Sequence, residues 1–201
     1  MKTLLTTELK TELTRQINND VKNIKSLINF IPNVIADIGA NVGYYTNAFL
    51  SEYPLAIVHS YEPQPDNLVE LHKIKNERLY IHEYGLFDSN KKMNIGMRDD
   101  NRYNNGTYGI YTNINSIEVL FKNANEEIIN ADLVKMDVEG SELYILQCND
   151  FFKSVKAIIV ELVYLDNFNQ NENIRNQLKY LGFEFSTKLN KNDELWIKNS
   201  I

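Results

Sequence analysis

Residues 34–46 read VIADIGANVGYYT, and this stretch decides the fold. The apolar run at 34–38 predicts a buried strand, and a glycine-bearing turn then opens a helix at 44–52. A strand, a tight turn and a helix in this order build the ligand crevice of doubly wound α/β folds, at the carboxyl ends of the strands. Asp37 ends the strand and Asn41 lies inside the turn. An acid there would repel a pyrophosphate and suits a cationic ligand better, which disfavours a dinucleotide.

Outward from this stretch, short apolar runs alternate with helical patterns. Further strands are expected at 56–61, 79–82, 133–136 and 157–163, and helices at 66–75, 117–123, 141–147 and 173–181. A hairpin is expected around 88–91, and the runs 183–188 and 194–197 flank a short turn and must pair antiparallel. The sequence therefore predicts an α/β, Rossmann-like doubly wound sheet of seven strands, mostly parallel, with an antiparallel hairpin at its C-terminal end.

An amphipathic pattern precedes this alternation. Its apolar positions are Leu9, Leu13, Ile17, Val21, Ile24 and Ile28. Spacings of three and four predict a helix with one apolar stripe inside an N-terminal extension, residues 1–31. The helix could pack on the domain's own sheet, cover a substrate mouth or dimerise, and periodicity does not separate these roles. The 201 residues suit a single domain.

Composition excludes several classes of function. The net charge is −6, with Lys and Arg scattered along the chain, so a nucleic-acid partner is not expected. No apolar run reaches the roughly 18 residues of a membrane span, and early charges interrupt any signal-peptide core. The single Cys148 cannot form an internal disulfide. We expect a cytoplasmic protein without a membrane span.

A polar loop rich in Asn and Gly occupies residues 99–115. Loops of this length inside a compact domain are more often functional or mobile than idle. We assign it to substrate contact, with Arg102, Tyr103 and Tyr108 as candidates, and a solvated, disordered loop remains the alternative.

Two further motifs suit an adenosine-like ligand. Glu62, in the stretch SYEP at 60–63, ends the second predicted strand, where a carboxylate can accept both hydroxyls of a ribose. The alternative is that Glu62 only caps the next helix. After the third strand, the stretch GLFD at 85–88 could line an adenine pocket, with an apolar contact from Leu86 and a polar one from Asp88.

Residues 132–142, DLVKMDVEGSE, bring several carboxylates to the end of another strand. Asp137, Glu139 and Glu142 would be costly if buried together without partners, so Lys135, helix-terminal amides, a metal or a ligand must satisfy them. Glu142 in the first turn of a helix has an ordinary explanation, because it compensates the helix dipole. Helix-dipole compensation does not explain Asp137 and Glu139, which points to a functional role for these two acids.

Together, DIGANVGYYT, YEPQPDN and VKMDVEGSEL resemble the FkbM-type methyltransferases, in this order and over residues 34–163. The resemblance implies a class I methyltransferase fold, S-adenosylmethionine as methyl donor and, usually, O-methylation of sugars or natural products. It places Asp37, Gly39, Asn41, Gly43 and Glu62 in the cofactor site and Asp137, Glu139 and Glu142 beside the transfer centre. The expected cofactor site also takes in Ala40, Tyr44, Tyr45, Thr46, Pro63, Leu86, Asp88 and Asp137.

Methyl transfer to a hydroxyl needs an aligned acceptor oxygen and a base for its proton. We expect Asp137 to be that base, oriented by Lys135 and Glu161. Alternatively, Asp137 and Glu139 hold a divalent metal such as Mg²⁺, which is not favoured because the sequence shows no further ligand set. The rival bases are His59, His72 and His82, the first and last inside predicted strands and the other on an exposed helix.

Other functions stay open at this level. An amine acceptor would need less help from a base, and an RNA ribose acceptor would need a basic surface that the chain lacks. An inactive cofactor-binding module is a candidate from another class, and a nicotinamide dehydrogenase is disfavoured by the acidic turn. The expected partner is a small-molecule or glycan acceptor, and the sequence specifies neither the acceptor nor the oligomeric state.

Overall fold

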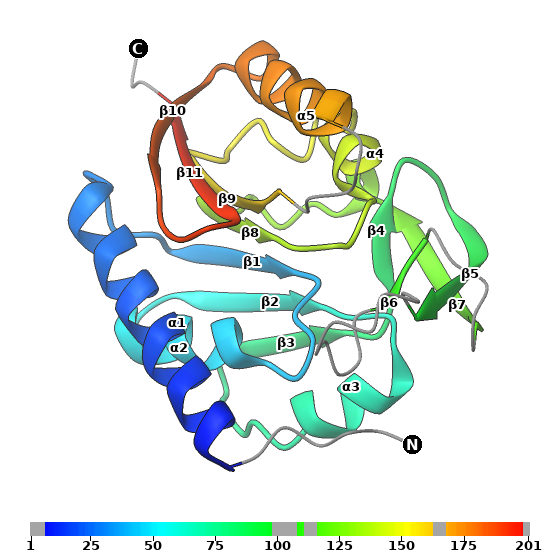
Figure 1. The fold of residues 1–201 in the computed structure, drawn as a ribbon, viewed down its shortest axis with the longest axis horizontal. Coiled ribbons are helices and arrows are strands. Elements are labelled where there is room, and N and C mark those ends of the chain that lie inside the picture. Colours follow the sequence, from blue (N-terminus) through cyan, green and yellow to red (C-terminus); the bar gives the residue numbers. More distant parts are fainter. Residues whose placement is uncertain (1–6, 98–107, 111–115, 163–167, 199–201) are drawn as a thin grey trace.

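The computed structural model describes residues 7–97, 108–110, 116–162 and 168–198. Within them, the main sheet has seven strands in the order β10-β11-β9-β8-β1-β2-β3 (Figure 1). Their bounds are β1 Val34–Ile38, β2 Ile57–Tyr61, β3 Leu79–His82, β8 Leu133–Met136, β9 Ala157–Glu161, β10 Phe183–Lys188 and β11 Asp193–Lys198. Within this sheet, β11 alone runs in the opposite direction to the other six strands. This confirms the predicted mostly parallel sheet with its C-terminal antiparallel hairpin.

Helices cover both faces of this sheet. Their bounds are α1 Thr7–Leu27, α2 Tyr44–Glu52, α3 Pro65–Leu71, the 3-10 turn η1 Ala124–Glu126, α4 Glu142–Leu146 and α5 Phe168–Tyr180. Alternate residues of a strand point to opposite faces, so β1 buries Ile35 in one core and Ala36 in another. Ile35 belongs to the core that α1 and α2 cover, and Ala36 belongs to the core that α4 and α5 cover. The arrangement is the doubly wound one expected from the alternation of elements.

A second, smaller sheet lies beside the carboxyl ends of the main strands (Figure 1). Its order is β4-β7-β5-β6, with bounds β4 Gly85–Phe87, β5 Lys91–Met97, β6 Tyr108–Gly109 and β7 Ile117–Asn123. The prediction of a helix at 117–123 is therefore wrong. Val119 and Phe121 are buried while Glu118 and Leu120 are exposed, which is the two-residue period of a strand.

The expected hairpin at 88–91 is also wrong in its pairing. The turn joins β4 to β5, but β7 lies between these two strands, parallel to β4 and antiparallel to β5. A turn signal fixes the change of chain direction and not the pairing partner, which here is set by packing of the small core Phe87, Ile95, Val119 and Phe121.

The polar loop predicted to contact substrate falls largely outside the described residues. Arg102 and Tyr103 are not among them. Tyr108 belongs to β6, whose backbone pairs with Gly96 and Met97 of β5. Its proposed role as a substrate contact stays a prediction.

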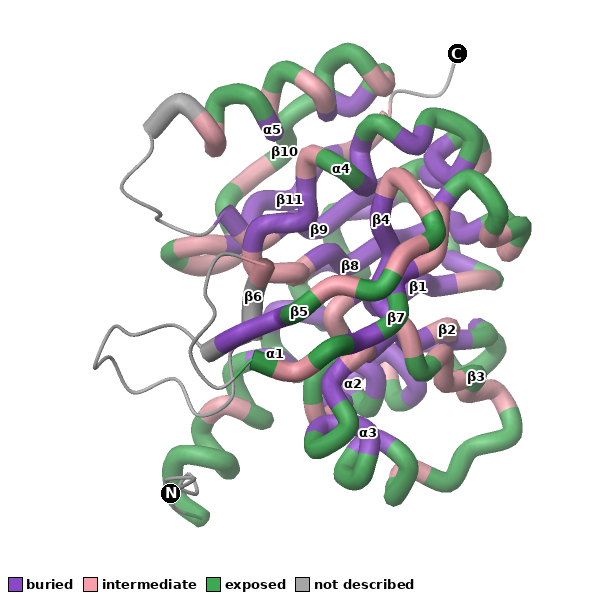
Figure 2. The backbone as a smooth tube through the Cα atoms, turned by 90° about the vertical axis from the view of Figure 1, so that its right-hand side faces the viewer, coloured by how far each residue is buried: buried purple, intermediate pink, exposed green. Residues whose placement is uncertain are grey.

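The N-terminal helix packs on the domain itself. Ile17, Val21 and Ile24 of α1 are buried in the same core as Phe49 of α2. The predicted stripe is longer than the buried one, since Leu9 is 54% exposed and the first turns of α1 lie open to solvent (Figure 2). None of the described helices is long and apolar enough to cross a membrane.

The packing role of α1 predicts a stability effect. Ile24→Ala removes a fully buried side chain and should lower the free energy of unfolding by about 2–5 kcal/mol. Leu27→Ala, on the same helix but 44% exposed, is the matched control and should change it by about 0.5 kcal/mol or less. Urea unfolding measures both. Equal, small effects would mean that α1 does not contribute to the core.

Candidate active site

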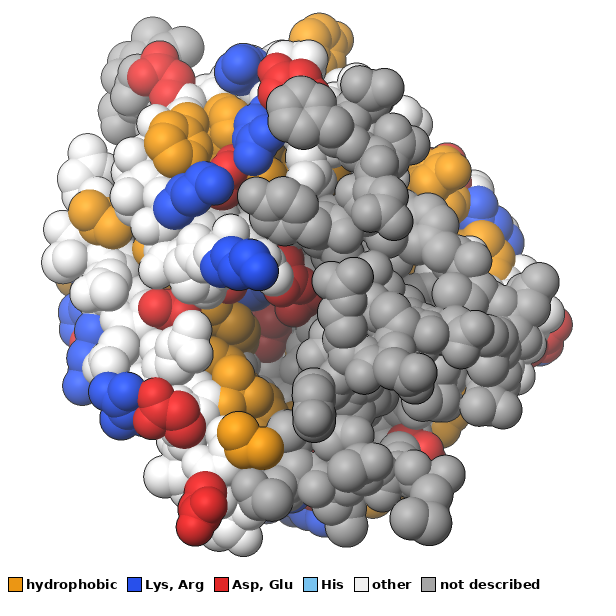
Figure 3. Space-filling model, in the orientation of Figure 1, with side chains coloured by type: hydrophobic (Ala, Val, Ile, Leu, Met, Phe, Trp, Pro, Cys, Tyr) orange, Lys and Arg blue, Asp and Glu red, His pale blue; other side chains and the backbone are white. Residues whose placement is uncertain are grey.

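A cavity of about 250 Å³ lies at the carboxyl ends of β1, β2, β8 and β9, between the main and the small sheet. One part of its wall is apolar and comes mainly from the small sheet and the residue after β6, with Leu86, Ile95, Ile110 and Phe121. The polar part is formed by Asn41, Glu62, Asp137, Glu139, Ser141 and Glu161. Acidic side chains gather at the bottom of a recess on the face that Figure 3 shows. The cavity is therefore acidic on one side and apolar on the other.

Gly39 allows the two turns at the edge of this cavity to meet. A Cβ at Gly39 would lie 1.8 Å from the backbone oxygen of Asp137, and the φ of Gly39 is +80°, a value that favours glycine. The turn after β1 is also tied to β2, because the N–H groups of Gly39 and Ala40 donate to the Tyr61 carbonyl. This close approach brings Asn41 and Asp137 to one cavity.

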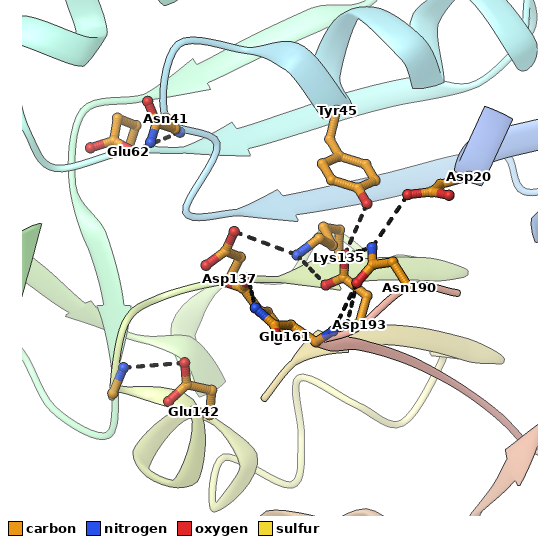
Figure 4. A network of polar contacts seen from close by, with 12 residues as sticks. Asp20, Asn41, Tyr45, Glu62, Lys135, Asp137, Glu142, Glu161, Asn190 and Asp193 are labelled. Atoms are coloured by element: carbon orange, nitrogen blue, oxygen red, sulfur yellow. Dashed lines mark hydrogen bonds and ion pairs between the residues drawn. The ribbon is translucent and has the colours of Figure 1, made fainter. Parts of the chain in front are cut away.

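Glu62 lies at the end of β2 and is only 5% exposed. Its Oε2 accepts the Asn41 N–H at 2.8 Å, and its Oε1 accepts the Gln64 N–H at 2.8 Å and Asn67 Nδ2 at 3.4 Å. Burial raises the pKa of Glu62 to about 7 despite these donors. The carboxyl group is thus positioned by backbone amides and lines the cavity from the side opposite the other acids (Figure 4).

The second group of acids follows from strand register. Side chains two residues apart share a face, so Asp137 lies on the same face as Lys135 of β8. Met136 pairs with Val160 of β9, which sets Asp137 beside Glu161. Glu161 in turn pairs with Asp193 of β11. Three carboxylates from three neighbouring strands therefore meet at one edge of the sheet (Figure 4).

Lys135 is a fully buried ammonium behind this row of acids, with 1% of its surface exposed. Its Nζ lies 3.2 Å from Asp193 Oδ1, 3.6 Å from Asp137 Oδ2 and 5.0 Å from the centre of the Tyr45 ring. Burial alone would lower the pKa of Lys135, but the charges of Asp193 and Asp137 raise it well above its usual value. Lys135 is therefore a permanent cation that restrains Asp137.

Asp193 is positioned by several groups as well. Its Oδ2 accepts the Tyr45 hydroxyl at 3.2 Å and Asn190 Nδ2 at 2.7 Å. Asn190 Nδ2 also donates to Asp20 of α1 at 3.3 Å. Burial would raise the pKa of Asp193, but Lys135 and these donors hold it below its usual value. The C-terminal hairpin and the N-terminal helix thus support the acids of the cavity.

Glu161 and Asp137 interact strongly. Burial, followed by the charge and hydrogen bonding of Asp137, raises the pKa of Glu161 to about 9. Glu161 and Asp137 are therefore close neighbours at this edge of the sheet. Glu139 completes the group, and carboxylate oxygens of Asp137, Glu139 and Glu161 all lie within 4.8 Å of one another. The backbone of Glu139 is in the left-handed region, with φ 49°, which non-glycine residues adopt at a cost.

Glu142 and Ser141 follow in the turn that opens α4. Glu142 is buried, accepts the Gly140 N–H at 3.2 Å, and has its pKa raised to about 7 by burial. It supports the turn and does not line the cavity. Ser141 does line the cavity, and its buried Oγ has no hydrogen-bond partner among the described residues.

Besides Glu142, which does not line the cavity, sixteen residues are predicted for the site, and half of them line the cavity. These are Gly39, Asn41, Glu62, Pro63, Leu86, Asp137, Glu139 and Glu161. The others lie in supporting positions and do not line the cavity that the described residues form. They are Asp37, Ala40, Gly43, Tyr44, Tyr45, Thr46, Asp88 and Lys135.

Asp37 and Asp88 show why some of the predicted residues do not line the cavity. The Asp37 carboxylate points to α2, where it accepts the Thr46 hydroxyl at 2.6 Å, and burial raises its pKa to about 6. Asp88 turns away to Ser89 and Lys91 in the turn between β4 and β5. A strand-end position predicts that a residue is near the crevice but not on which face its side chain lies.

The three histidines do not line the cavity that the described residues form. His59 and His82 form a hydrogen bond with each other at 2.9 Å, and His72 pairs with Glu83 on the surface.

The sequence did not reveal six residues in or beside the site. They are Asn67, Ser141 and Asp193, together with Ile95, Ile110 and Phe121 in or next to the small sheet. Asp193 was detectable in principle, because the register of the C-terminal hairpin sets it beside Glu161. Phe121 was hidden by the wrong helix prediction at 117–123, and Ile110 lies in the polar loop, from which only Arg102, Tyr103 and Tyr108 were chosen as candidates.

The family model described as "Methyltransferase FkbM domain" matches residues 37–185. Among solved structures, the precorrin-6y C5,15-methyltransferase of Geobacter metallireducens is 14% identical with a TM-score of 0.54, over 99% of this chain and 93% of that one. A fibrillarin/Nop5p complex is 11% identical with a TM-score of 0.51, over 88% and 77%. At these identities the structures show a shared fold only. No curated protein sequence matches the chain.

The raised pKa of Glu142 predicts that Glu142→Gln changes stability in a pH-dependent way. The pKa of Glu142 is about 7 in the folded protein against an ordinary value of 4.5, so the folded state binds more protons between these values. This contribution to stability is fully present below about pH 4.5 and is lost as pH rises through about 7. Glu142→Gln, which mimics the protonated acid, should therefore gain stability relative to the unmutated protein as pH rises from about 4.5 to about 7. Urea unfolding at each pH measures the difference, and a constant difference would contradict the burial of this acid.

Proposed function

The chain belongs to the FkbM methyltransferase family, and we propose that it transfers a methyl group from S-adenosylmethionine to a hydroxyl group of a small molecule or glycan. One observation carries the proposal: a single cavity is lined by Glu62 and by the separate cluster of Asp137, Glu139 and Glu161. Glu62 is suited to bind the hydroxyls of a ribose. The acid cluster is suited to a positively charged cofactor and to taking a proton from the acceptor. When bound, the cofactor supplies a methyl group on a positively charged sulfur.

The cavity offers an acceptor for the ribose and an apolar wall for the purine of an adenosine group. A carboxylate has about four acceptor positions, and the N–H groups around Glu62 use three, one of them through the long contact from Asn67. Glu62 Oε2 can therefore accept one ribose hydroxyl directly, and the weakly bound Asn67 can turn to the second. The apolar wall from Leu86, Ile95 and Phe121 suits a flat purine ring.

The acid cluster favours a hydroxyl acceptor. A hydroxyl must lose its proton as its oxygen attacks, whereas an amine needs less help from a base. Asp137 is partly accessible, with 35% of its side chain exposed, and the buried Lys135 restrains one of its oxygens. We propose Asp137 as the base and Lys135 as the residue that positions it. An acidic cavity also disfavours an acceptor carried on a phosphate backbone.

The proposed division of roles predicts two different phenotypes. Glu62→Gln should weaken S-adenosylmethionine binding about tenfold or more, because a charged acceptor for the ribose is lost. Asp137→Asn should lower that affinity much less, because Glu139 and Glu161 remain in the cluster, and should lower methyl transfer to a hydroxylated acceptor about 100-fold to 10,000-fold. Glu118→Gln, an exposed site on the small sheet, is the control and should change neither.

Calorimetric titration with S-adenosylmethionine gives the affinities, and transfer of labelled methyl to a panel of hydroxylated and amine acceptors gives the activity. Thermal unfolding of each variant checks that the turn around Glu62 is retained. Equal loss of binding in both variants would contradict the division of roles. Absence of binding by the unmutated protein would overturn the proposed function.

A further inference from the structure

Three carboxylates beside the proposed transfer centre have the geometry of a cation site. Oxygens of Asp137, Glu139 and Glu161 lie within 4.8 Å of one another. Ligand oxygens about 2.0–2.6 Å from one divalent ion are at most about 4–5 Å apart, so one ion can contact all three with small side-chain shifts. Hard divalent cations prefer such oxygen ligands. We propose that these residues bind one divalent cation, which holds the acceptor hydroxyl; the binding site stands by itself, and its catalytic role rests on the proposed function.

Two of the three ligands lie at strand ends of the main sheet. Asp137 follows β8, Glu161 ends β9, and the two strands are paired in the main sheet. Glu139 lies in the turn to α4, where the left-handed backbone is followed by Gly140 with φ 110°. A cation site needs ligands whose separation is fixed by the fold, and two neighbouring strand ends supply this.

A second, independent observation comes from Ser141. The residue is 2% exposed, its Oγ has no hydrogen-bond partner among the described residues, and it lines the same cavity. A buried hydroxyl without a partner is destabilising, so a group inside the cavity is expected to satisfy it. A hydroxyl oxygen can contact a hard cation directly or through a coordinated water.

The charge around the cluster also favours a cation. Asp193 lies directly behind the three acids, and the Lys135 ammonium divides its single charge between Asp193 and Asp137 (Figure 4). Two carboxylates, Asp137 and Asp193, share this one buried ammonium, which leaves a net negative charge among these three groups. A divalent cation would neutralise this excess, which repulsion between the acids otherwise makes costly.

The cation would complete the proposed reaction. It binds the acceptor oxygen and lowers the pKa of the hydroxyl, so that a carboxylate can take the proton. The oxygen lone pair then forms the new carbon–oxygen bond as the carbon–sulfur bond breaks. The electrons of the broken bond would return to sulfur, which would become a neutral thioether, and the Asp137 carboxylate would take the proton. The cation is not consumed.

Titration of the full chain with Mn²⁺, without cofactor, tests the site directly. Calorimetry should show one ion bound per chain. Glu139→Gln and Glu161→Gln should each weaken binding about tenfold or more, Ser141→Ala should weaken it less, and the exposed control Glu118→Gln should leave it unchanged. Thermal unfolding confirms that each variant is folded. No stoichiometric binding, or binding that both Gln variants leave intact, would overturn the site.

Failure of this proposal is distinguishable from failure of the methyltransferase assignment. With the cation site in use, methyl transfer should fall about tenfold or more after EDTA treatment and return with Mg²⁺, while S-adenosylmethionine affinity stays measurable throughout. Transfer that is insensitive to EDTA would overturn the catalytic role of the cation and leave the proposed function standing. Mn²⁺ binding without any S-adenosylmethionine binding would support the cation site and overturn the proposed methyltransferase function.

Discussion

The buried ammonium of Lys135 is the interaction on which the site depends. A buried charge is tolerated only when it is paired, and loss of one partner of such a pair costs about 3–5 kcal/mol. Lys135 is paired with Asp137 on its own strand and with Asp193 on the C-terminal hairpin. Asn190 extends the same network to Asp20 of α1. Segments at the two ends of the chain are thereby tied to the acid proposed as the base.

The acids of the cavity are held either by backbone amides or by a buried cation. This difference matches their proposed roles in binding the cofactor and in proton transfer. Glu62 is held by backbone N–H groups of the turns around it, which fixes its position. Asp137 is held by charge, through Lys135, and shares a face with Glu161. An acid fixed by amides is suited to accept hydrogen bonds from a ribose. An acid in a charged cluster is suited to protons and cations.

Much of the fold could be predicted from the sequence, because short apolar runs, glycine turns and the final hairpin are local signals. The position of Glu62 at the end of β2 follows from the same local reasoning. Pairing could not be predicted in the same way: residues 117–123 form β7 because packing in the small core decided between helix and strand. The meeting of Asp137, Glu161 and Asp193 depends on register across three strands, and the burial of Asp37 under α2 depends on which face its side chain takes.

The most direct test of the account is a crystal structure of the protein with S-adenosylhomocysteine bound. The account predicts that a ribose hydroxyl lies within hydrogen-bond distance of Glu62, that the purine lies against Leu86 and Phe121, and that the sulfur faces the cluster of Asp137, Glu139 and Glu161. A ligand bound elsewhere, or bound here with its ribose away from Glu62, would contradict it.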